Sequence, residues 1–372
     1  MSRLHIPASL LACVALSFCW PEHGYAQRAL QEVSSVPEAT IRDGFSDIAG
    51  VRVLRDGRVL VLDVMEQRLV VADFETGKVE PIGRAGRGPG EYVRATRLIA
   101  LSADSTWLVD VGQNRILVLV GTSIVGALPA FAGAAVDSGL SAASLRGADA
   151  RGFVYFTGRG VSTSERGIVP ADSVMLFAAS RDGGTLEPLG RLAQAAASIT
   201  VRKGSGSDQS VHVVRVPFVV GDEAIVDLDG TVTVARRAPY RLSVLRRGSA
   251  AVHGPTRSIP RVPVTDQDRQ QYLATLSPAA AASMDAVPWP SHKPPYVTRS
   301  LASSPRGVRW IMRSGPASAT TGTYDVFDAT GRWIGNRAVA AGVRIAWMGE
   351  SHALAVRVDE DGLNHLERYR LR

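Results

Sequence analysis

Cysteine is almost absent from this chain of 372 residues, which contains only Cys13 and Cys19. Both lie in the first apolar run, Ile6 to Trp20, which we expect to be removed from the mature protein. The remaining chain then has no disulfide, no thiolate nucleophile and no cysteine ligand for a metal. Its stability must therefore come from burial and hydrogen bonding alone.

Lysine is scarce as well, with three residues against a formal net charge of +7, so arginine carries nearly all of the positive charge. The arginines are scattered singly or in pairs, such as Arg236-Arg237, among Asp and Glu residues. They form no continuous basic run and are not interleaved with aromatic residues, unlike those of a nucleic-acid-binding groove. We therefore expect no nucleic-acid partner, and at most a general preference for anionic surfaces.

Residues 1–26 are typical of a secretory signal peptide. Arg3 precedes an apolar run too short to span a bilayer, and the small residues Gly24 and Ala26 precede the expected cleavage site. We expect cleavage after Ala26, export to the periplasm or the outside of the cell, and no membrane span afterwards. Two alternatives stay open, namely an uncleaved membrane anchor and a lipid anchor at Cys13, where Leu10 to Cys13 resembles a lipobox.

A repeat of about 47 residues organises the rest of the chain. Asp63-Val64, followed by Arg68-Leu69, recurs as Asp110-Val111, followed by Arg115-Ile116, at a constant offset of 47 residues. Within each unit, short β-branched runs alternate with turn residues and show no helical period. A four-stranded meander cannot bury both faces by itself, so its repetition predicts an all-β propeller, in which neighbouring blades cover each other.

Six units predict one domain over residues 27–372, a monomer with six four-stranded antiparallel blades. The last unit, from Arg344, contains only three strands before the chain ends. We expect an isolated N-terminal strand over Leu30 to Val36 to supply the fourth strand and close the ring. A seventh blade within the weakly matching stretch 121–221 is the alternative.

The segment Gly83 to Tyr92, with the later Asp110-Val-Gly-Gln-Asn-Arg-Ile116, resembles the NHL-type repeat of six-bladed β-propellers. The sequence is similar above all to exported bacterial propellers of unknown activity. This resemblance covers residues 45–120 and, more weakly, 222–372, and it implies the fold rather than an activity. Because no Lys-Ser/Thr pair follows Gly83 to Gly90, these glycines predict a tight connection between blades rather than a phosphate-binding loop.

Residues 265–296 interrupt the repeat. Thr265-Asp266-Gln267-Asp268 resembles a helix capping box, and a proline-rich segment follows from Trp289 to Tyr296. We expect a short helical insertion with a stiff return. It would form either a lid over the channel mouth or a strap across the edge of a blade.

No catalytic set assembles in the sequence. Gly349 to Ala353 approximates a nucleophile elbow but lies between two predicted strands instead of between a strand and a helix. Propeller lactonases hold calcium with several Asn, Asp and Glu side chains, whereas this chain has three asparagines, and no two of its histidines have a paired ligand spacing. We therefore predict no cofactor, no metal and no catalytic residue.

The resulting expectation is a non-catalytic binding or scaffolding propeller that engages a protein, peptide or glycan at its channel mouth. The alternative is a metal-dependent lyase or lactone hydrolase on the same scaffold. The predicted ligand-binding residues are Arg68, Arg94, Arg115, Tyr296 and Arg299. Arg68 and Arg115 occupy matching turns of two units, where a purely structural role is also open, and the other three precede predicted innermost strands.

Overall fold

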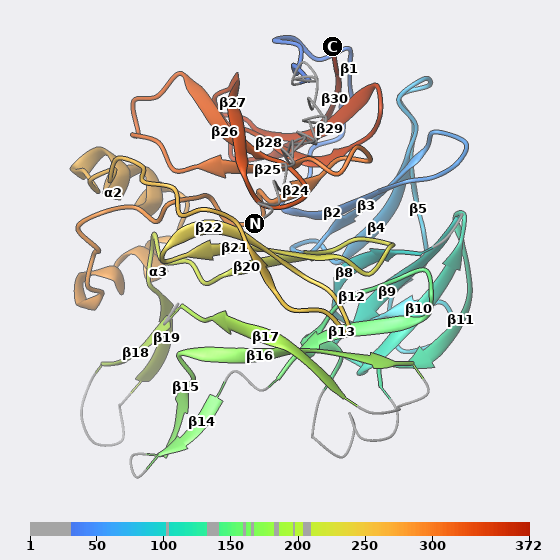
Figure 1. Cartoon of the computed structure of the whole chain (residues 1–372), viewed down its shortest axis with the longest axis horizontal. Helices are drawn as coiled ribbons and strands as arrows, with labels where there is room; N and C mark the ends of the chain where they lie inside the picture. Colours follow the sequence, from blue (N-terminus) through green and yellow to red (C-terminus); the bar gives the residue numbers. More distant parts are fainter. Residues whose placement is uncertain are drawn as a thin grey trace, which may run out of the picture. The chain divides into compact units, whose positions relative to one another are not determined.

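Six four-stranded antiparallel sheets make up the computed structural model of this chain (Figure 1). The structure describes residues 31–101, 104–131, 141–158, 161–164, 167–181, 186–195, 198–203 and 210–372. Residues Glu32–Arg372 form one compact unit. The predicted signal peptide, with Cys13, lies outside the described residues.

Each sheet is one blade, and its strands follow one another from the inner to the outer side. Blade 1 contains β2 (Ile48–Val53), β3 (Val59–Asp63), β4 (Arg68–Ala72) and β5 (Val79–Pro81). Blade 2 contains β8 (Ala95–Ala100), β9 (Ser105–Asp110), β10 (Arg115–Val120) and β11 (Ser123–Pro129). Blade 3 contains β12 (Leu145–Ala148), β13 (Phe153–Thr157), β16 (Ser173–Ser180) and β17 (Glu187–Ala193). Blade 4 contains β20 (Glu223–Val226), β21 (Val232–Arg237), β22 (Tyr240–Leu245) and β23 (Val252–His253). Blade 5 contains β24 (Ala302–Ser303), β25 (Arg309–Arg313), β26 (Thr321–Phe327) and β27 (Trp333–Ala340). Blade 6 contains β28 (Val343–Met348), β29 (His352–Val358), β30 (Asn364–Arg370) and β1 (Ala39–Thr40).

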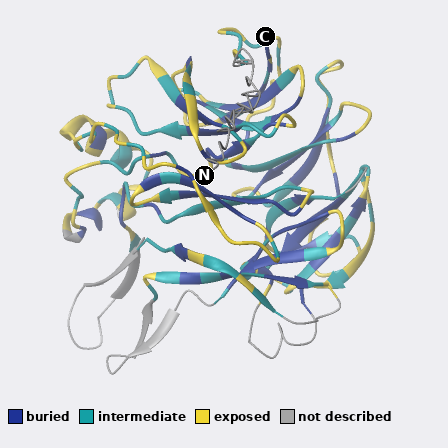
Figure 2. Ribbon diagram, in the orientation of Figure 1, coloured by how far each residue is buried: buried dark blue, intermediate teal, exposed yellow. Residues whose placement is uncertain are grey.

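The core lies between the blades rather than inside any one of them. Separate apolar clusters join blade 6 to blade 1, 1 to 2, 2 to 3, 3 to 4 and 4 to 5. Between blades 5 and 6, the backbone N–H of Ile345 donates to the buried hydroxyl of Tyr324 at 2.7 Å. The middle strands are the most buried, as Figure 2 shows, because both of their faces are covered by neighbouring sheets.

The ring is closed by the N-terminal segment, as the sequence predicts. β1 pairs with β30, with Ala39 opposite Arg368. The predicted strand, Leu30 to Val36, is displaced, because the regular pairing lies at Ala39–Thr40 and Val33 forms a single bridge to Leu371. Ser34 donates to the carbonyl of Arg370 and Glu38 donates to that of Arg368, so an offset of four residues in the N-terminal segment matches one of two residues in β30 and interrupts the regular pairing.

The stretch 121–221 holds blade 3 and two additional hairpins. One hairpin, β14 (Val161–Ser164) with β15 (Gly167–Pro170), lies between β13 and β16 in the sequence. The other consists of β18 (Ser198–Lys203) and β19 (Ser210–Arg215). The described residues therefore contain six blades, and these hairpins occupy the stretch where a seventh was the alternative.

The predicted insertion is helical and begins with the predicted capping box. It contains α2 (Asp266–Ala274), α3 (Pro278–Ala281) and the 3₁₀ turn η3 (Met284–Ala286). The hydroxyl of Thr265 accepts from the N–H of Asp268, whose carboxylate in turn accepts from the N–H of Thr265 at 2.9 Å. Lys293 anchors the return segment to the same carboxylate at 2.5 Å. Aspartate thus takes the place of the usual Glu or Gln in the box.

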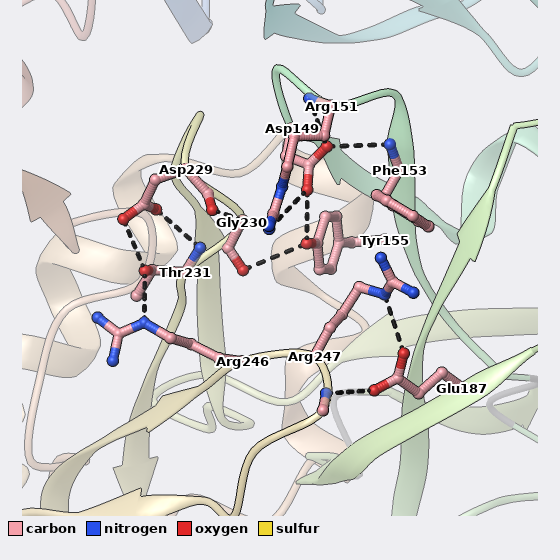
Figure 3. Close-up of polar contacts among 11 residues, drawn as sticks. Asp149, Arg151, Phe153, Tyr155, Glu187, Asp229, Gly230, Thr231, Arg246 and Arg247 are labelled. Carbon is pink, nitrogen blue, oxygen red and sulfur yellow. Dashed lines mark hydrogen bonds and ion pairs between the residues drawn. The ribbon is translucent and has the colours of Figure 1, made fainter.

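A polar contact between blades 3 and 4 gives a direct test of the packing (Figure 3). The hydroxyl of Tyr155 donates to Asp149 at 3.0 Å and lies 3.2 Å from the carbonyl oxygen of Gly230. Gly230 has a φ of +83°, and a Cβ there would lie 2.7 Å from the Tyr155 hydroxyl oxygen and 2.7 Å from Nη2 of Arg151. We expect Gly230→Ala to destabilise the fold by about 2 kcal/mol, measured by urea unfolding.

Gly57 is the matched control for this substitution. It also follows an aspartate in a turn, with a φ of +88°, but a Cβ at this position would have no atom within 4 Å beyond its chain neighbours. Gly57→Ala should cost only the backbone strain, about 1 kcal/mol. Equal losses for the two variants would show that the contact with Tyr155 is not close-packed.

Candidate functional site

The innermost strand of blade 5 is broken just where the return segment of the insertion joins it. Tyr296 forms an isolated bridge to Arg313, and the N–H of Val297 donates to the carbonyl of Met312 at 2.9 Å. Regular pairing then resumes only at β24, with Ala302 opposite Trp310. Residues 298–301 therefore bulge out of the sheet at the end where the inner strands begin.

Arg299, in this bulge, joins three other blades. Its φ of +58° is uncommon for any residue except glycine. Its guanidinium pairs with Asp47, the residue before β2, at 2.8 Å, and its N–H donates to the carboxylate of Glu223 at 2.9 Å. Its carbonyl accepts from Nη1 of Arg344 at 3.0 Å. Asp47, Glu223, Arg299 and Arg344 thus form one polar group, which we call the axial cluster.

Glu223 is the most perturbed carboxyl in the cluster. It lies at the start of β20 and accepts from the N–H groups of Arg299 and Leu301. Burial raises its pKa from 4.5 to about 7, although these two hydrogen bonds and the charges of Arg344 and Arg299 act in the opposite direction. A carboxyl that titrates near neutrality beside two guanidinium groups is suited to binding a polar ligand or transferring a proton.

Arg344 completes the cluster from β28 of blade 6. Its Nη2 donates to the carbonyl of Ile48 at 3.1 Å, so the guanidinium connects blade 6 with blade 1 and with the bulge of blade 5. Burial lowers its pKa, and the neighbouring charge of Arg299 acts in the same direction, whereas Asp47 and Glu223 offset part of the effect. The axial cluster therefore contains two arginines and two carboxylates.

The structure separates the five predicted ligand-binding residues. Arg299 is half exposed and belongs to the axial cluster. Tyr296 is fully buried, with its hydroxyl 2.8 Å from the carbonyl of Gly221 and 2.9 Å from that of Ala235, so it joins blades 4 and 5 and offers nothing to a ligand. The exposed Arg94 has its N–H bound to Asp110 at 3.0 Å.

Arg68 and Arg115 lie on either side of the glycine-rich segment 83–92. Arg68 lines a hollow of about 510 Å³ together with Glu66 and Arg84, and Arg115 lines a second hollow of about 450 Å³ beside Arg87. Between them, Glu91 accepts from the N–H of Gly88 at 2.7 Å and leaves no room for a Cβ at Gly86. The amides of this segment thus bind a side chain of the same protein, as expected for a connection between blades.

The structural role of the two aspartates in the repeated turns is confirmed. Asp63 accepts from the N–H groups of Met65 and Glu66, and Asp110 accepts from that of Gly112, each at 3.1 Å. The arginines differ, because Nε of Arg115 lies 3.7 Å from Asp110, whereas the guanidinium of Arg68 lies 5.1 Å from the ring centre of Phe45. Equivalent positions in two repeats therefore have different contacts.

Several charged residues of the inner strands were not predicted from the sequence. They are Glu223, Arg344 and two arginines of neighbouring blades, Arg97 on β8 and Arg146 on β12. Their only signal in the sequence is a single charged residue within an otherwise apolar run, as in Leu145-Arg146-Gly147. Arg94, which precedes the same strand as Arg97, was the predicted residue, and its role in binding stays a prediction.

Catalytic arrangements receive little support from the described residues. Among them, no three or more His, Cys, Asp and Glu side chains are grouped so as to hold a metal ion. The Ser351 hydroxyl lies 2.9 Å from Nδ1 of His352, whose Nε2 lies 2.8 Å from Glu38. Ser291 and His292 make the same 2.9 Å contact, so it follows from adjacency in the sequence, and Glu38 is also bound by Arg370.

Comparison with known proteins agrees with this fold. Residues 42–120, which hold blade 1 and most of blade 2, match a family model described as a 6-bladed beta-propeller. With the six sheets, this match identifies the protein as a six-bladed β-propeller. A search among curated proteins finds no significant match.

Several solved structures are similar to the chain at low identity. One is a protein of Bacteroides fragilis predicted to be exported, with 14% identity over 92% of this chain and 95% of that chain and a TM-score of 0.48. Another is virginiamycin B lyase from Staphylococcus aureus, with 10% identity over 92% of this chain and 99% of that chain and a TM-score of 0.41. A third is regucalcin, a calcium-binding protein from Agrobacterium tumefaciens, with 11% identity over 90% of this chain and 95% of that chain and a TM-score of 0.38. These values support no argument about activity.

Proposed function

We propose that this protein is an exported, monomeric, non-catalytic binding or scaffolding propeller, which engages a protein, peptide or glycan at the end of the ring where the inner strands begin. The observation that carries this proposal is the conformation of Arg299. A non-glycine residue with a φ of +58° is strained, and such strain is retained mostly at functional sites. Here the same residue pairs with Asp47 through its guanidinium and donates its N–H to Glu223.

Export is supported by the sequence of residues 1–26 and by the absence of cysteine from the chain that follows. No helix in the described part of the chain is long and apolar enough to cross a membrane. We place the mature protein in the periplasm or outside the cell. Detection of the chain in a periplasmic or culture fraction, with an N-terminus at Gln27, would support this location.

The binding surface can be tested with a glycan array and an immobilised peptide library as probes. We expect Arg299→Gly to weaken the strongest interaction at least about tenfold, because glycine accepts the backbone conformation while the guanidinium is lost. The matched control is Arg306→Ala, which removes a half-exposed arginine paired with Glu350 at the opposite end of β24. Equal effects of the two substitutions would place the binding surface elsewhere.

The alternative, a metal-dependent lyase or lactone hydrolase, is separated by two measurements on the same purified protein. Elemental analysis measures stoichiometric calcium or zinc, and incubation with lactones or modified peptides measures turnover. Glu223, whose pKa near 7 suits a general acid or base, is the group that favours this alternative. Stoichiometric metal together with metal-dependent turnover would replace the binding proposal by the enzymatic one.

A further inference from the structure

Arg97 and Arg146 occupy related positions on the inner strands of two neighbouring blades. Both lie at the beginning of their strands, the end of the ring at which the axial cluster lies. The pairing of β8 with β9 shifts register between Ala95 and Arg97, and that of β12 with β13 shifts between Leu145 and Gly147. Bulges of this kind redirect side chains and are common beside binding sites.

The two arginines are close to each other, and their side-chain hydrogen bonds to described residues all go to backbone carbonyls. Nη1 of Arg97 donates to the carbonyl oxygen of Arg146 at 3.3 Å, and Nη1 of Arg146 donates to that of Ala143 at 3.2 Å. Each guanidinium carries five N–H donors, so most of its donors are left for other partners. Both residues are partly buried, so each retains some exposed surface.

No carboxylate neutralises this pair among the residues that the structure describes. Burial and, to a smaller extent, the charge of Arg146 lower the pKa of Arg97 to about 10, with no described acidic residue acting in the opposite direction. Burial alone lowers the pKa of Arg146. Both groups remain charged at neutral pH, so two like charges lie side by side in a partly desolvated position.

Other described arginines have acidic partners. Arg309, at the start of β25, pairs with Asp227 at 2.6 Å, and Arg344, on the inner strand β28, has Asp47 and Glu223 near it. A structural arginine pair would gain stability from an acidic residue, as these do. Within the described part of the chain, no counter-charge accompanies Arg97 and Arg146, which points to one that a ligand supplies.

We propose that Arg97 and Arg146 together bind an oxyanion group, a carboxylate or a phosphate, of the ligand that this propeller engages. Planar guanidinium groups bind both kinds of anion through paired, charge-assisted hydrogen bonds. The inference rests on the proposed function for the surface involved and adds the chemical class of the ligand.

Inorganic phosphate and citrate are suitable probes, titrated calorimetrically into the purified mature chain at low ionic strength, with chloride as the reference. We expect at least one of the two to bind more tightly than chloride, and the stronger one identifies the preferred anion. Arg97→Ala and Arg146→Ala should each weaken this binding about tenfold or more, and the double variant should abolish it. Arg332→Ala, which removes an exposed arginine from the turn before β27, should leave it unchanged.

Melting temperatures without added anion distinguish binding from a structural role. Removal of one arginine relieves repulsion on the other, so the single variants should melt at the same temperature as the wild type or higher. Affinities no better than for chloride, or the same loss in Arg332→Ala, would overturn the proposal. So would single variants that melt lower and retain anion binding. The anion titration uses no peptide or glycan, so its result does not depend on the glycan-array and peptide-library screens that test the proposed function.

Discussion

A mature chain that begins at Ser46 instead of Gln27 is expected to lose more than about 5 kcal/mol of unfolding free energy. The deletion removes Ile41 and Phe45, which are 0% and 1% exposed and pack in the cluster between blades 6 and 1. It also removes the backbone hydrogen bonds by which Glu38, Ile41 and Phe45 donate to carbonyls of β30. Urea unfolding followed by circular dichroism measures the loss.

The uncovered edge of β30 has a second consequence. Unpaired strand edges associate with other chains, so the truncated protein should aggregate at concentrations at which the intact chain stays monomeric. A chain that begins at Gln31 retains every one of these contacts and is the matched control. A synthetic peptide of residues 32–45, added in trans, should restore part of the stability. Unchanged stability of the truncated chain would mean that three strands suffice for blade 6.

The second large effect concerns Glu223 and pH. Its pKa is raised to about 7 in the folded protein from 4.5, so the folded state holds this proton more tightly than the unfolded chain does. Below about pH 4.5 the carboxyl therefore does not reduce the free energy of unfolding, and the reduction grows as the pH rises toward 7. Above pH 7 the reduction is constant at about 3 kcal/mol. This contribution to stability decreases with rising pH, opposite to that of a salt-bridged carboxylate.

Glu223→Gln should remove this pH dependence. The unfolding free energy of the variant minus that of the wild type should increase by up to about 3 kcal/mol between pH 5 and pH 8. Glu80→Gln, at an exposed position of β5, is the control and should show little change between the two pH values. Parallel stability curves for Glu223→Gln and the wild type would show that burial does not perturb this carboxyl.

Several features of the fold follow from residues that are close together in the sequence. Asp63 and Asp110 recur because each repeat must satisfy the amides of the same turn, and Thr265 and Asp268 satisfy the first amides of α2. Ring closure was predictable from an unpaired strand at each end of the chain. The position of the closing strand was not, because pairing with β30 depends on where the buried Ile41 fits.

The candidate site shows the opposite behaviour. Arg299 and Asp47 are 252 residues apart, and neither residue carries a mark of the contact in its own segment. Tyr296 and Arg299 both precede β24, yet one is fully buried and the other joins the axial cluster, because a bulge of four residues reverses their surroundings. Bulges of one residue likewise decide the surroundings of Arg97 and Arg146.

The sequence by itself thus determined that cysteine contributes nothing to the described fold, that four-stranded blades repeat around a ring and that its two ends close it, whereas the choice of six blades over seven came from the structure. These properties depend on periodic burial and on hydrogen bonds within a few residues. Only the tertiary structure decided which charges meet where the inner strands begin. There, each side chain is placed by strands from different blades, and the balance between Arg97, Arg146 and the carboxylates of the axial cluster exists only once the ring has closed.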